Sequence, residues 1–472
     1  MEPARLTSLI DLNRARPEPL AVQLYRDLLA AILAGRAQGS LPSSRVTAAA
    51  LGLSRNTVNA AYDLLRAEGA VAIAPCQAPR ILPVGSGAPP PPTANSTGLP
   101  GLHARGLVWG ADARTNHGRM APGQPDMALF PRDAWAMTLR RTARNIRPAD
   151  LAYDHYAGLP RLREVLARRL AADRGMDLRP DQILVTAGSQ AALALLALTL
   201  AGPGDPVLVE DPGYGGAKAA FSGAGLVSLP IPVDGEGADC RNAPPARLVY
   251  LTPANQYPLG HRLSLARREA ILAYARQHEA VLIEDDYDSE FLWHGREIAA
   301  LQGRAPERVV TIGTVAKALA PALRLGWIVA PPHLAEGLRA AQRNLGLAAN
   351  HHAQAALADF MDQGGYRAHL HRIARTYGDR GRAFAAALRR LPGIELQDPS
   401  GGVQLTISLP EAAEAPALAA LRRAGFGCQP LSGFCLGPPR FGLVGGFADA
   451  TPGRIDDFCA VLGQVLNART GP

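Results

Sequence analysis

Lys317 is the side chain in this sequence with the most distinctive chemistry. The chain has 472 residues but only two lysines, Lys218 and Lys317, and its other basic side chains are arginines. A lysine amine can lose its proton when its pKa is lowered and can then condense with an aldehyde, which a guanidinium cannot do. A functional amine is therefore predicted at Lys317, within the run Gly-Thr-Val-Ala-Lys-Ala-Leu-Ala-Pro-Ala-Leu-Arg-Leu-Gly of residues 313–326. Lys218 is interpreted as a chance product of composition.

Groups that could bind a ligand follow two of the expected strands. The segment 185–190, Val-Thr-Ala-Gly-Ser-Gln, precedes the apolar stretch 191–201, so backbone N–H groups and a hydroxyl at a helix start can form an anion cup. Tyr214 follows the apolar run 207–210 and could stack on a flat ring, or it could be a core tyrosine beside a turn. Each feature alone also fits an ordinary end of a strand.

Acidic residues end a further strand. Asp285 lies in the segment 284–290, Glu-Asp-Asp-Tyr-Asp-Ser-Glu, directly after the apolar run 281–283. A carboxylate there faces the ligand crevice of an α/β sheet and could hold a pyridine nitrogen protonated. Arg324, seven residues beyond Lys317, could add a second grip on a phosphate. Cup, stacking ring, carboxylate and amine together describe one ligand, pyridoxal 5′-phosphate (PLP).

The elements that must position these groups alternate along the chain from about residue 107. Short runs that are apolar throughout are separated by Ala- and Arg-rich helices such as 265–276 and 334–343. Such strands predict an α/β fold with a mostly parallel sheet covered on both faces. The clearest runs are 207–210, 248–251, 281–284 and 309–312.

The first 83 residues have a different pattern. Helical spacing over 20–33 is followed by a short helix over 46–51, a turn at Gly52 and a second helix from the N-cap Ser54 to Gly69. This is a helix-turn-helix pattern, in which the start of the second helix enters the major groove of double-stranded DNA. The alternative is a generic helical hairpin. The predicted DNA contacts are Arg45, Ser54, Arg55, Thr57 and Asn59.

Between these zones, residues 84–106 are rich in Pro and Gly and are predicted to form a semi-stiff linker, so the domains are predicted as 1–83 and 107–472.

The net charge of +8 is compatible with a polyanionic partner. The five cysteines show neither a disulfide framework nor metal-ligand spacing, so we expect no metal and a cytoplasmic protein. The longest apolar run, 191–201, is too short to span a membrane.

Longer strings of residues resemble a known family. The N-terminal strings resemble the winged helix-turn-helix of GntR regulators. Taken with several strings from the second zone, they make the chain similar over nearly its whole length to MocR/GabR-type regulators. In that family a winged helix-turn-helix is joined by a linker to a fold-type I PLP aminotransferase-like domain. The matching segments are 41–45, 54–58, 62–69, 121–131, 156–164, 252–260 and 313–326.

The resemblance assigns roles to individual residues. It implies that Lys317 is the Schiff-base lysine, that Asp285 is the partner of the pyridine nitrogen, and that Tyr287 donates to the ring hydroxyl. Tyr214 would be the stacking aromatic, and Gln256 lies in a segment that faces the cofactor. The implied phosphate ligands are Gly188, Ser189, Gln190 and Arg324.

The resemblance also implies a homodimer and a smaller α+β C-terminal subdomain over roughly 350–472. The sequence departs from the family pattern at Ala316, usually Ser, and at Gly216 and Val444, where members often carry an arginine for a substrate carboxylate. The wing tip, residues 74–80, lacks the usual Gly-x-Gly-Thr-like string.

Two functions are therefore weighed. The first is a transcriptional regulator that senses PLP, an amine or an amino acid. The alternative is an active aminotransferase with a vestigial DNA-binding head, since Lys317, Asp285 and Tyr287 are in principle a sufficient catalytic set for proton abstraction. A protein with an inactive site is a third possibility.

Overall fold

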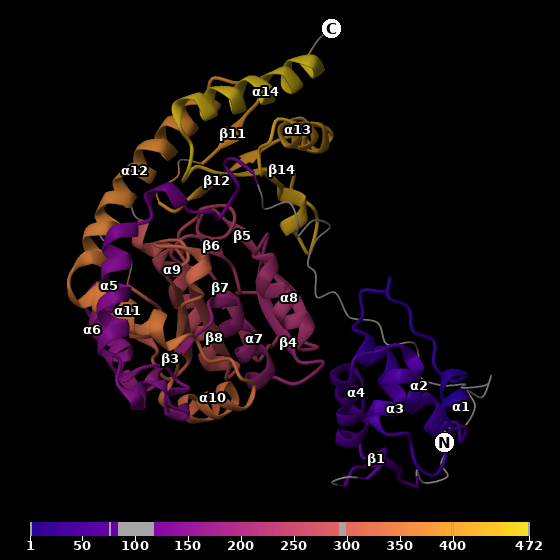
Figure 1. The fold of residues 1–472 in the computed structure, drawn as a ribbon. Coiled ribbons are helices and arrows are strands. Elements are labelled where there is room, and N and C mark those ends of the chain that lie inside the picture. The colour runs from indigo at the N-terminus through magenta and orange to yellow at the C-terminus, as the bar shows by residue number, and fades with distance from the viewer. Residues whose placement is uncertain are drawn as a thin grey trace. The chain divides into compact units, whose positions relative to one another are not determined.

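The computed structural model describes residues 2–74, 77–83, 118–291, 299–397, 399 and 401–470. The chain divides into two compact units, Met1–Arg105 and Gly106–Pro472, and each is described by itself (Figure 1). The predicted linker, residues 84–106, lies outside the described residues, as do Pro75 and Cys76 of the predicted wing tip.

The N-terminal unit is a small helical domain with a two-stranded antiparallel sheet, which confirms the predicted winged helix-turn-helix. Its core contains Leu24, Leu28, Val58 and Leu65, all fully buried. Its elements are α1 (Pro3–Thr7), α2 (Leu20–Leu33), α3 (Ser44–Leu51), α4 (Arg55–Ala67), β1 (Val71–Ala72) and β2 (Arg80–Ile81).

Caps fix the turn between α3 and α4. Gly52 ends α3 with a φ of 62°, a left-handed conformation that glycine adopts without strain. The Ser54 hydroxyl accepts a hydrogen bond from the Thr57 N–H, 3.1 Å away, and so begins α4. The Tyr62 hydroxyl donates to the Pro42 carbonyl at 2.8 Å and ties α4 to the residues before α3. Because Ser43 caps α3, that helix begins two residues before the predicted start at residue 46.

The second unit is built on an eight-stranded sheet in the order β3-β10-β9-β8-β7-β4-β5-β6. The five strands from β9 to β5 in this order are mutually parallel, whereas β10 and β6 run antiparallel to their neighbours. The predicted mostly parallel sheet is confirmed. The strands are β3 (Ile183–Thr186), β4 (Pro206–Asp211), β5 (Val227–Asp234), β6 (Gly237–Ala238), β7 (Leu248–Leu251), β8 (Val281–Asp286), β9 (Val309–Thr314) and β10 (Gly326–Val329).

Helices cover both faces of this sheet because its strands are apolar on both sides. Residues of α7, α8 and α10 pack in one apolar cluster with Leu184, Tyr250 and Ile312. On the other face α9 packs with Val249 and Leu282, and α6 packs on β3. The helices of these layers are α5 (Arg132–Asn145), α6 (Pro160–Arg174), α7 (Ser189–Leu200), α8 (Gly215–Gly223), α9 (Leu265–Gln277), α10 (Pro332–Asn344) and α11 (His351–Asp362).

A second, antiparallel sheet with the order β11-β12-β14-β13 forms the C-terminal part, as Figure 1 shows at the end of the unit that also carries α13 and α14. The long helix α12 leads to it. Of the segment predicted as a small subdomain, 350–472, the first helix α11 packs on α5 and α6 rather than on this sheet. The elements are α12 (Gly365–Leu388), β11 (Glu395–Leu396), β12 (Gln404–Ser408), α13 (Glu411–Arg423), β13 (Gln429–Pro430), β14 (Gly442–Gly446) and α14 (Pro452–Thr470).

The sheet topology brings the predicted site residues to one edge. β3, β4, β8 and β9 all run in the same direction, so their carboxyl ends meet at one side of the sheet. In the described part of the chain, no helix is both long and apolar enough to cross a membrane. The same residues contain no group of three His, Cys, Asp or Glu side chains placed to hold a metal ion.

Candidate PLP-binding site and DNA-binding surface

A cavity of about 110 Å³ lies at the carboxyl ends of these strands. Five of the predicted residues, Ser189, Tyr214, Asp285, Tyr287 and Lys317, line it. Most of the other residues that line the cavity had no predicted ligand role. Tyr250 was recognisable only as a polar residue within an apolar strand. The remaining lining residues are Pro122, Gly123, Tyr250, Thr252, Tyr257, Thr314 and Ala316.

Lys317 extends its amine into this cavity from the segment after β9. Its Nζ donates to the Gly123 carbonyl oxygen at 2.5 Å. Burial lowers the pKa of Lys317, and the Asp288 and Asp285 carboxylates oppose this shift. A lowered pKa increases the fraction of neutral amine, which is the form that attacks an aldehyde.

Gly123 explains why the amine has room to lie there. Its φ is 70°, and a Cβ added at this position would lie 3.3 Å from Lys317 Nζ. A side chain at residue 123 would therefore crowd the amine and strain the backbone. The segment around Gly123 matched the family string, but the contact with Lys317 joins residues that are 194 positions apart in the sequence.

Asp285 presents one unpaired oxygen in the buried part of the site. The Tyr250 hydroxyl donates to Asp285 Oδ2 at 2.7 Å, whereas Oδ1 is buried and has no hydrogen-bond partner. Burial raises the pKa of Asp285 to about 6, and the Tyr250 hydrogen bond opposes the rise. An unpaired buried carboxylate oxygen is costly, and the protonated nitrogen of a pyridine ring is a suitable donor for it. The residues present thus fit PLP.

Aromatic side chains form one wall. The Tyr257 ring packs edge-on against Tyr214 and Tyr287, with centroid distances of 5.5 and 6.0 Å. The Tyr287 hydroxyl donates to the Asn255 carbonyl at 2.9 Å. Tyr287 must therefore exchange this partner before it can donate to a cofactor hydroxyl. Burial raises the pKa of Tyr214 to about 12, so its hydroxyl is neutral at physiological pH.

The other end of the site lies at the start of α7. Gly188 is the N-cap of this 12-residue helix and has a φ of 90°, with no side chain capping the first N–H groups. A Cβ added at Gly188 would lie 3.4 Å from the guanidinium carbon of Arg324, so this arginine borders the helix start. Uncapped N–H groups, the Ser189 hydroxyl and a guanidinium together suit a phosphate.

The predicted DNA contacts lie on two helices of the N-terminal unit. Arg45 on α3 and Arg55 and Asn59 on α4 are exposed. Thr57 is half-buried, and the Ser54 hydroxyl is engaged as the cap of α4. The first turns of α4 therefore present Arg55 and Asn59 to solvent, as a recognition helix requires.

Comparison with known proteins decides the family. The family of class I and II aminotransferases matches residues 123–462. The chain is 38% identical over 467 residues to the probable rhizopine catabolism regulatory protein MocR of Rhizobium meliloti, covering 94% of this chain and 93% of the relative. It is 31% identical over 407 residues to the HTH-type pyridoxine biosynthesis transcriptional regulator PdxR of Corynebacterium glutamicum, covering 84% and 85% of the two chains.

The chain belongs to the MocR-type HTH transcriptional regulators that carry an aminotransferase class I and II domain.

A solved structure supports the fold of this domain. The α-aminoadipate aminotransferase LysN of Thermus thermophilus, complexed with N-(5′-phosphopyridoxyl)-L-leucine, is similar with a TM-score of 0.67 and 28% identity. The similarity covers 74% of the MocR-type chain and 92% of LysN. The matches over whole regulators support a transcriptional regulator over an active aminotransferase, and the aminotransferase domain indicates PLP as the cofactor.

Two residues of this MocR-type regulator that were predicted to contact the cofactor, Gln256 and Gln190, donate their side-chain hydrogen bonds to backbone carbonyls instead. Gln256 is 1% exposed and does not line the cavity, because its Nε2 donates to the carbonyls of Pro212 and Tyr257. Its geometry is that of a residue that holds a loop. Gln190 donates from Nε2 to the Gly216 carbonyl at 2.8 Å, so its amide braces the start of α8.

At Gly216 and Val444, the two positions where the family pattern often has a carboxylate-binding arginine, the surroundings are tightly packed. A Cβ added at Gly216 would lie 2.6 Å from the Tyr214 hydroxyl and 2.7 Å from Gln190 Oε1. Val444 is fully buried in an apolar cluster. Arg440 donates to the Val233 carbonyl at 3.3 Å, and no arginine lines the cavity among the residues that the structure describes.

The interpretation of Lys218 as chance is corrected by its surroundings. This lysine is 1% exposed, and its Nζ donates to the Phe434 carbonyl in a short 3-10 helix, residues Leu431–Phe434. Burial lowers the pKa of Lys218 to about 8. Lys218 thus joins α8 to the C-terminal part, a contact between residues 216 positions apart that no local pattern reveals.

Proposed function

We propose that this MocR-type regulator binds operator DNA through α3 and α4, and that PLP held by Lys317 changes the strength of that binding. The observation that carries the proposal is the meeting of the Lys317 amine and the unpaired Asp285 oxygen in one cavity. Because the chain also carries a helix-turn-helix, such a site can act as a PLP sensor that controls DNA binding.

Each residue of the site has a distinct part in this proposal. PLP, when bound, supplies an aldehyde that reacts with amines. Lys317 would hold that aldehyde through Nζ and give up its hydrogen bond to the Gly123 carbonyl. Asp285 Oδ1 would accept the ring N–H, while Tyr250 keeps the carboxylate in place. Ser189, the start of α7 and Arg324 would take the phosphate.

The DNA-binding part follows from the exposed side chains of α3 and α4. Arg55 and Asn59 would contact base edges in the major groove, and Arg45 would contact the phosphate backbone, with Thr57 and Ser54 at the helix start. We propose a cytoplasmic homodimer, because a single small head makes too few phosphate contacts for strong binding and two half-sites multiply affinity.

The sensed ligand is proposed to be PLP itself or an amine that condenses with it. The closed positions Gly216 and Val444 leave no guanidinium to grip an α-carboxylate inside the cavity. A free carboxylate is held best by a bidentate arginine, so ordinary amino-acid substrates lack their main anchor. This argues for a regulator and against efficient transamination.

The test is a titration of the full-length chain with PLP, in which absorbance of the bound cofactor and binding to the DNA upstream of the chain's own gene are followed together. We expect DNA affinity to change at the same PLP concentration that saturates the absorbance. Lys317→Ala should bind DNA with the affinity of the PLP-free protein at every PLP concentration. DNA binding of wild type that is indifferent to PLP would refute the sensing role.

A further inference from the structure

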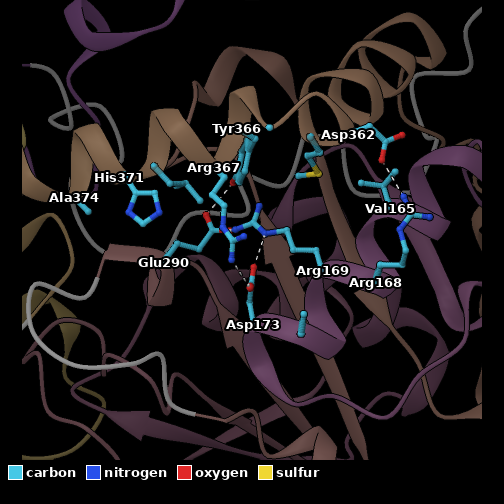
Figure 2. A pocket seen from close by; sticks show the side chains of 14 residues that line it. Val165, Arg168, Arg169, Asp173, Glu290, Asp362, Tyr366, Arg367, His371 and Ala374 are labelled. Carbon is cyan, nitrogen blue, oxygen red and sulfur yellow. Dashed lines mark hydrogen bonds and ion pairs between the residues drawn. The ribbon is translucent and has the colours of Figure 1, made fainter.

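A second cavity of about 640 Å³ lies between α6, the end of α11 and the first half of α12, away from the proposed PLP site (Figure 2). The two cavities share no lining residue. Residues of α6 at positions 165, 168, 169, 172 and 173 line one side, which is the spacing of a single helix face. From the opposite side, α12 contributes residues including Arg367 and His371.

One side of this cavity can hold an anion. Arg367 and His371 are one turn apart on α12 and therefore lie on the same face. The Arg367 side chain is 77% exposed, and its Nη2 is 3.6 Å from Asp173 Oδ1, longer than an ordinary hydrogen bond. Figure 2 shows Arg367 reaching from α12 toward Asp173. Arg367 can thus turn to a ligand at little cost.

Asp173, which faces Arg367 directly, can hold a cation. Asp173 on α6 keeps 26% of its side chain exposed and accepts from Arg169 Nε at 3.2 Å. Glu290, by contrast, is fully engaged, because it pairs with Arg169 and accepts from the Tyr366 hydroxyl at 2.8 Å. The Arg169 guanidinium lies 4.3 Å from the centre of the Tyr366 ring, which fixes it further. Asp362, the third carboxylate that lines the cavity, pairs with Arg161 and Arg168. Asp173 Oδ1, with Arg367 3.6 Å away, is therefore the carboxylate oxygen best placed to receive a new donor.

Beside this charged pair, part of the lining is apolar. Val165 and Ala172 on α6 face the cavity, as do Leu370 and Ala374 on α12. A ligand that engages both groups needs an anionic and a cationic group close together, as in the head of an amino acid, and an uncharged body. The volume is within the range of sites for small molecules.

We propose that this cavity binds a small zwitterion, an amino acid, with its carboxylate on Arg367 and His371 and its ammonium on Asp173. This second cavity would bind ligands with a carboxylate, for which the PLP cavity has no anchoring arginine. It does not require PLP to be bound, so it stands apart from the function proposed above.

The position of Glu290 connects this cavity with the PLP site. Glu290 lines the large cavity, and Tyr287, three residues earlier in the same segment, lines the PLP cavity. A small void between them is lined by both residues and by Asp173. The two cavities are thus lined by residues of one short segment, 287–290.

The experiment is calorimetric titration of the full-length, PLP-saturated protein with glycine, L-leucine, L-glutamate, L-arginine and 4-aminobutyrate, with cofactor absorbance recorded in parallel. We expect at least one of these zwitterions to bind. Arg367→Gln and Asp173→Asn should each weaken its binding roughly tenfold or more, since each removes a charge-assisted hydrogen bond. Arg375→Gln is the matched control, an exposed arginine of α12 that does not line the cavity, and should bind as wild type does.

Three results would overturn the proposal. One is the absence of binding for every compound in the panel. Another is unchanged affinity in both Arg367→Gln and Asp173→Asn, with circular dichroism and PLP content confirming that these variants are folded. The third is binding that disappears in Lys317→Ala, which would place the ligand in the PLP cavity. None of these results bears on the PLP-dependence of DNA binding, so the two proposals fail separately.

Discussion

Asp285 is held in a state that is costly without a ligand. Its Oδ1 is buried without a partner, and its pKa is raised from 3.8 to about 6 by burial. The folded PLP-free protein therefore favours the protonated carboxyl more than the unfolded chain does. The charged form lowers stability progressively as pH rises from about 4 to about 6, and a shift of this size corresponds to roughly 3 kcal/mol. Binding of a ring N–H would remove this cost.

Asp285→Asn should consequently stabilise the PLP-free protein while impairing PLP binding. We expect its melting temperature to exceed that of wild type above pH 6, and the difference to shrink to nothing as pH falls below about 4. PLP affinity should drop at least tenfold, because the charge-assisted hydrogen bond to the ring nitrogen is lost. Thermal melts across pH and absorbance titrations measure the two effects. A variant less stable than wild type at neutral pH would contradict the assignment.

Tyr250 is expected to set the pH at which the site accepts PLP. Its hydrogen bond favours the charged form of Asp285, so Tyr250→Phe should raise the pKa of that carboxyl further above about 6. PLP affinity of wild type should fall as pH drops through about 6, and the variant should show this fall at higher pH. Absorbance titrations over a pH series give both midpoints. Tyr274→Phe, which removes a remote hydroxyl bonded to the Pro244 carbonyl, is the control and should keep the wild-type midpoint.

The residues of the site differ in how far sequence could predict them. Lys317, Asp285, Tyr214 and Ser189 follow strands in recognisable strings, and the structure brings them together. The contact of Gly123 with Lys317 depends on the path of a distant segment, which spacing does not encode.

At the scale of elements, two neighbouring residues at the start of α4 have different roles, one in folding and one in DNA recognition. Ser54 accepts from the Thr57 N–H and caps the helix, whereas Arg55 is exposed beside it. Ser54→Ala should destabilise the N-terminal unit by about 1 kcal/mol, the usual cost of losing a cap. Arg55→Ala should leave its stability unchanged and weaken DNA binding by roughly 1–3 kcal/mol if Arg55 contacts a base. Denaturation and DNA-binding curves of both variants test this, and equal loss of stability in Arg55→Ala would contradict it.

Element boundaries were predicted best where a local signal exists. The helix over residues 20–33 and the strand over 248–251 were found as predicted, because amphipathic spacing and a fully apolar run are local properties. Strand direction is not local. The antiparallel run of β10 between β3 and β9 and the two-residue strands β11 and β13 depend on neighbours far along the chain.

At the scale of the whole molecule, a change of composition separated the two units in the sequence, and the structure divides the chain at Arg105 and Gly106. The extent of the smaller C-terminal part was harder to predict. Which layer a helix of the second unit belongs to depends on its packing partners, which are distant in the sequence. The helix α11, for example, packs on α5 and α6. The proposed regulator therefore carries its cofactor site on the large sheet and its second proposed site between α6 and α12, both within one unit.

The most direct test of this account asks which atom holds the cofactor. The full-length protein is incubated with PLP, reduced with borohydride, digested and mapped by mass spectrometry. Because the chain has only two lysines, Lys218 serves as an internal control. We predict the phosphopyridoxyl mass on the peptide that contains Lys317 and none on the peptide that contains Lys218. An unmodified Lys317 peptide, or a label on Lys218 instead, would contradict the account.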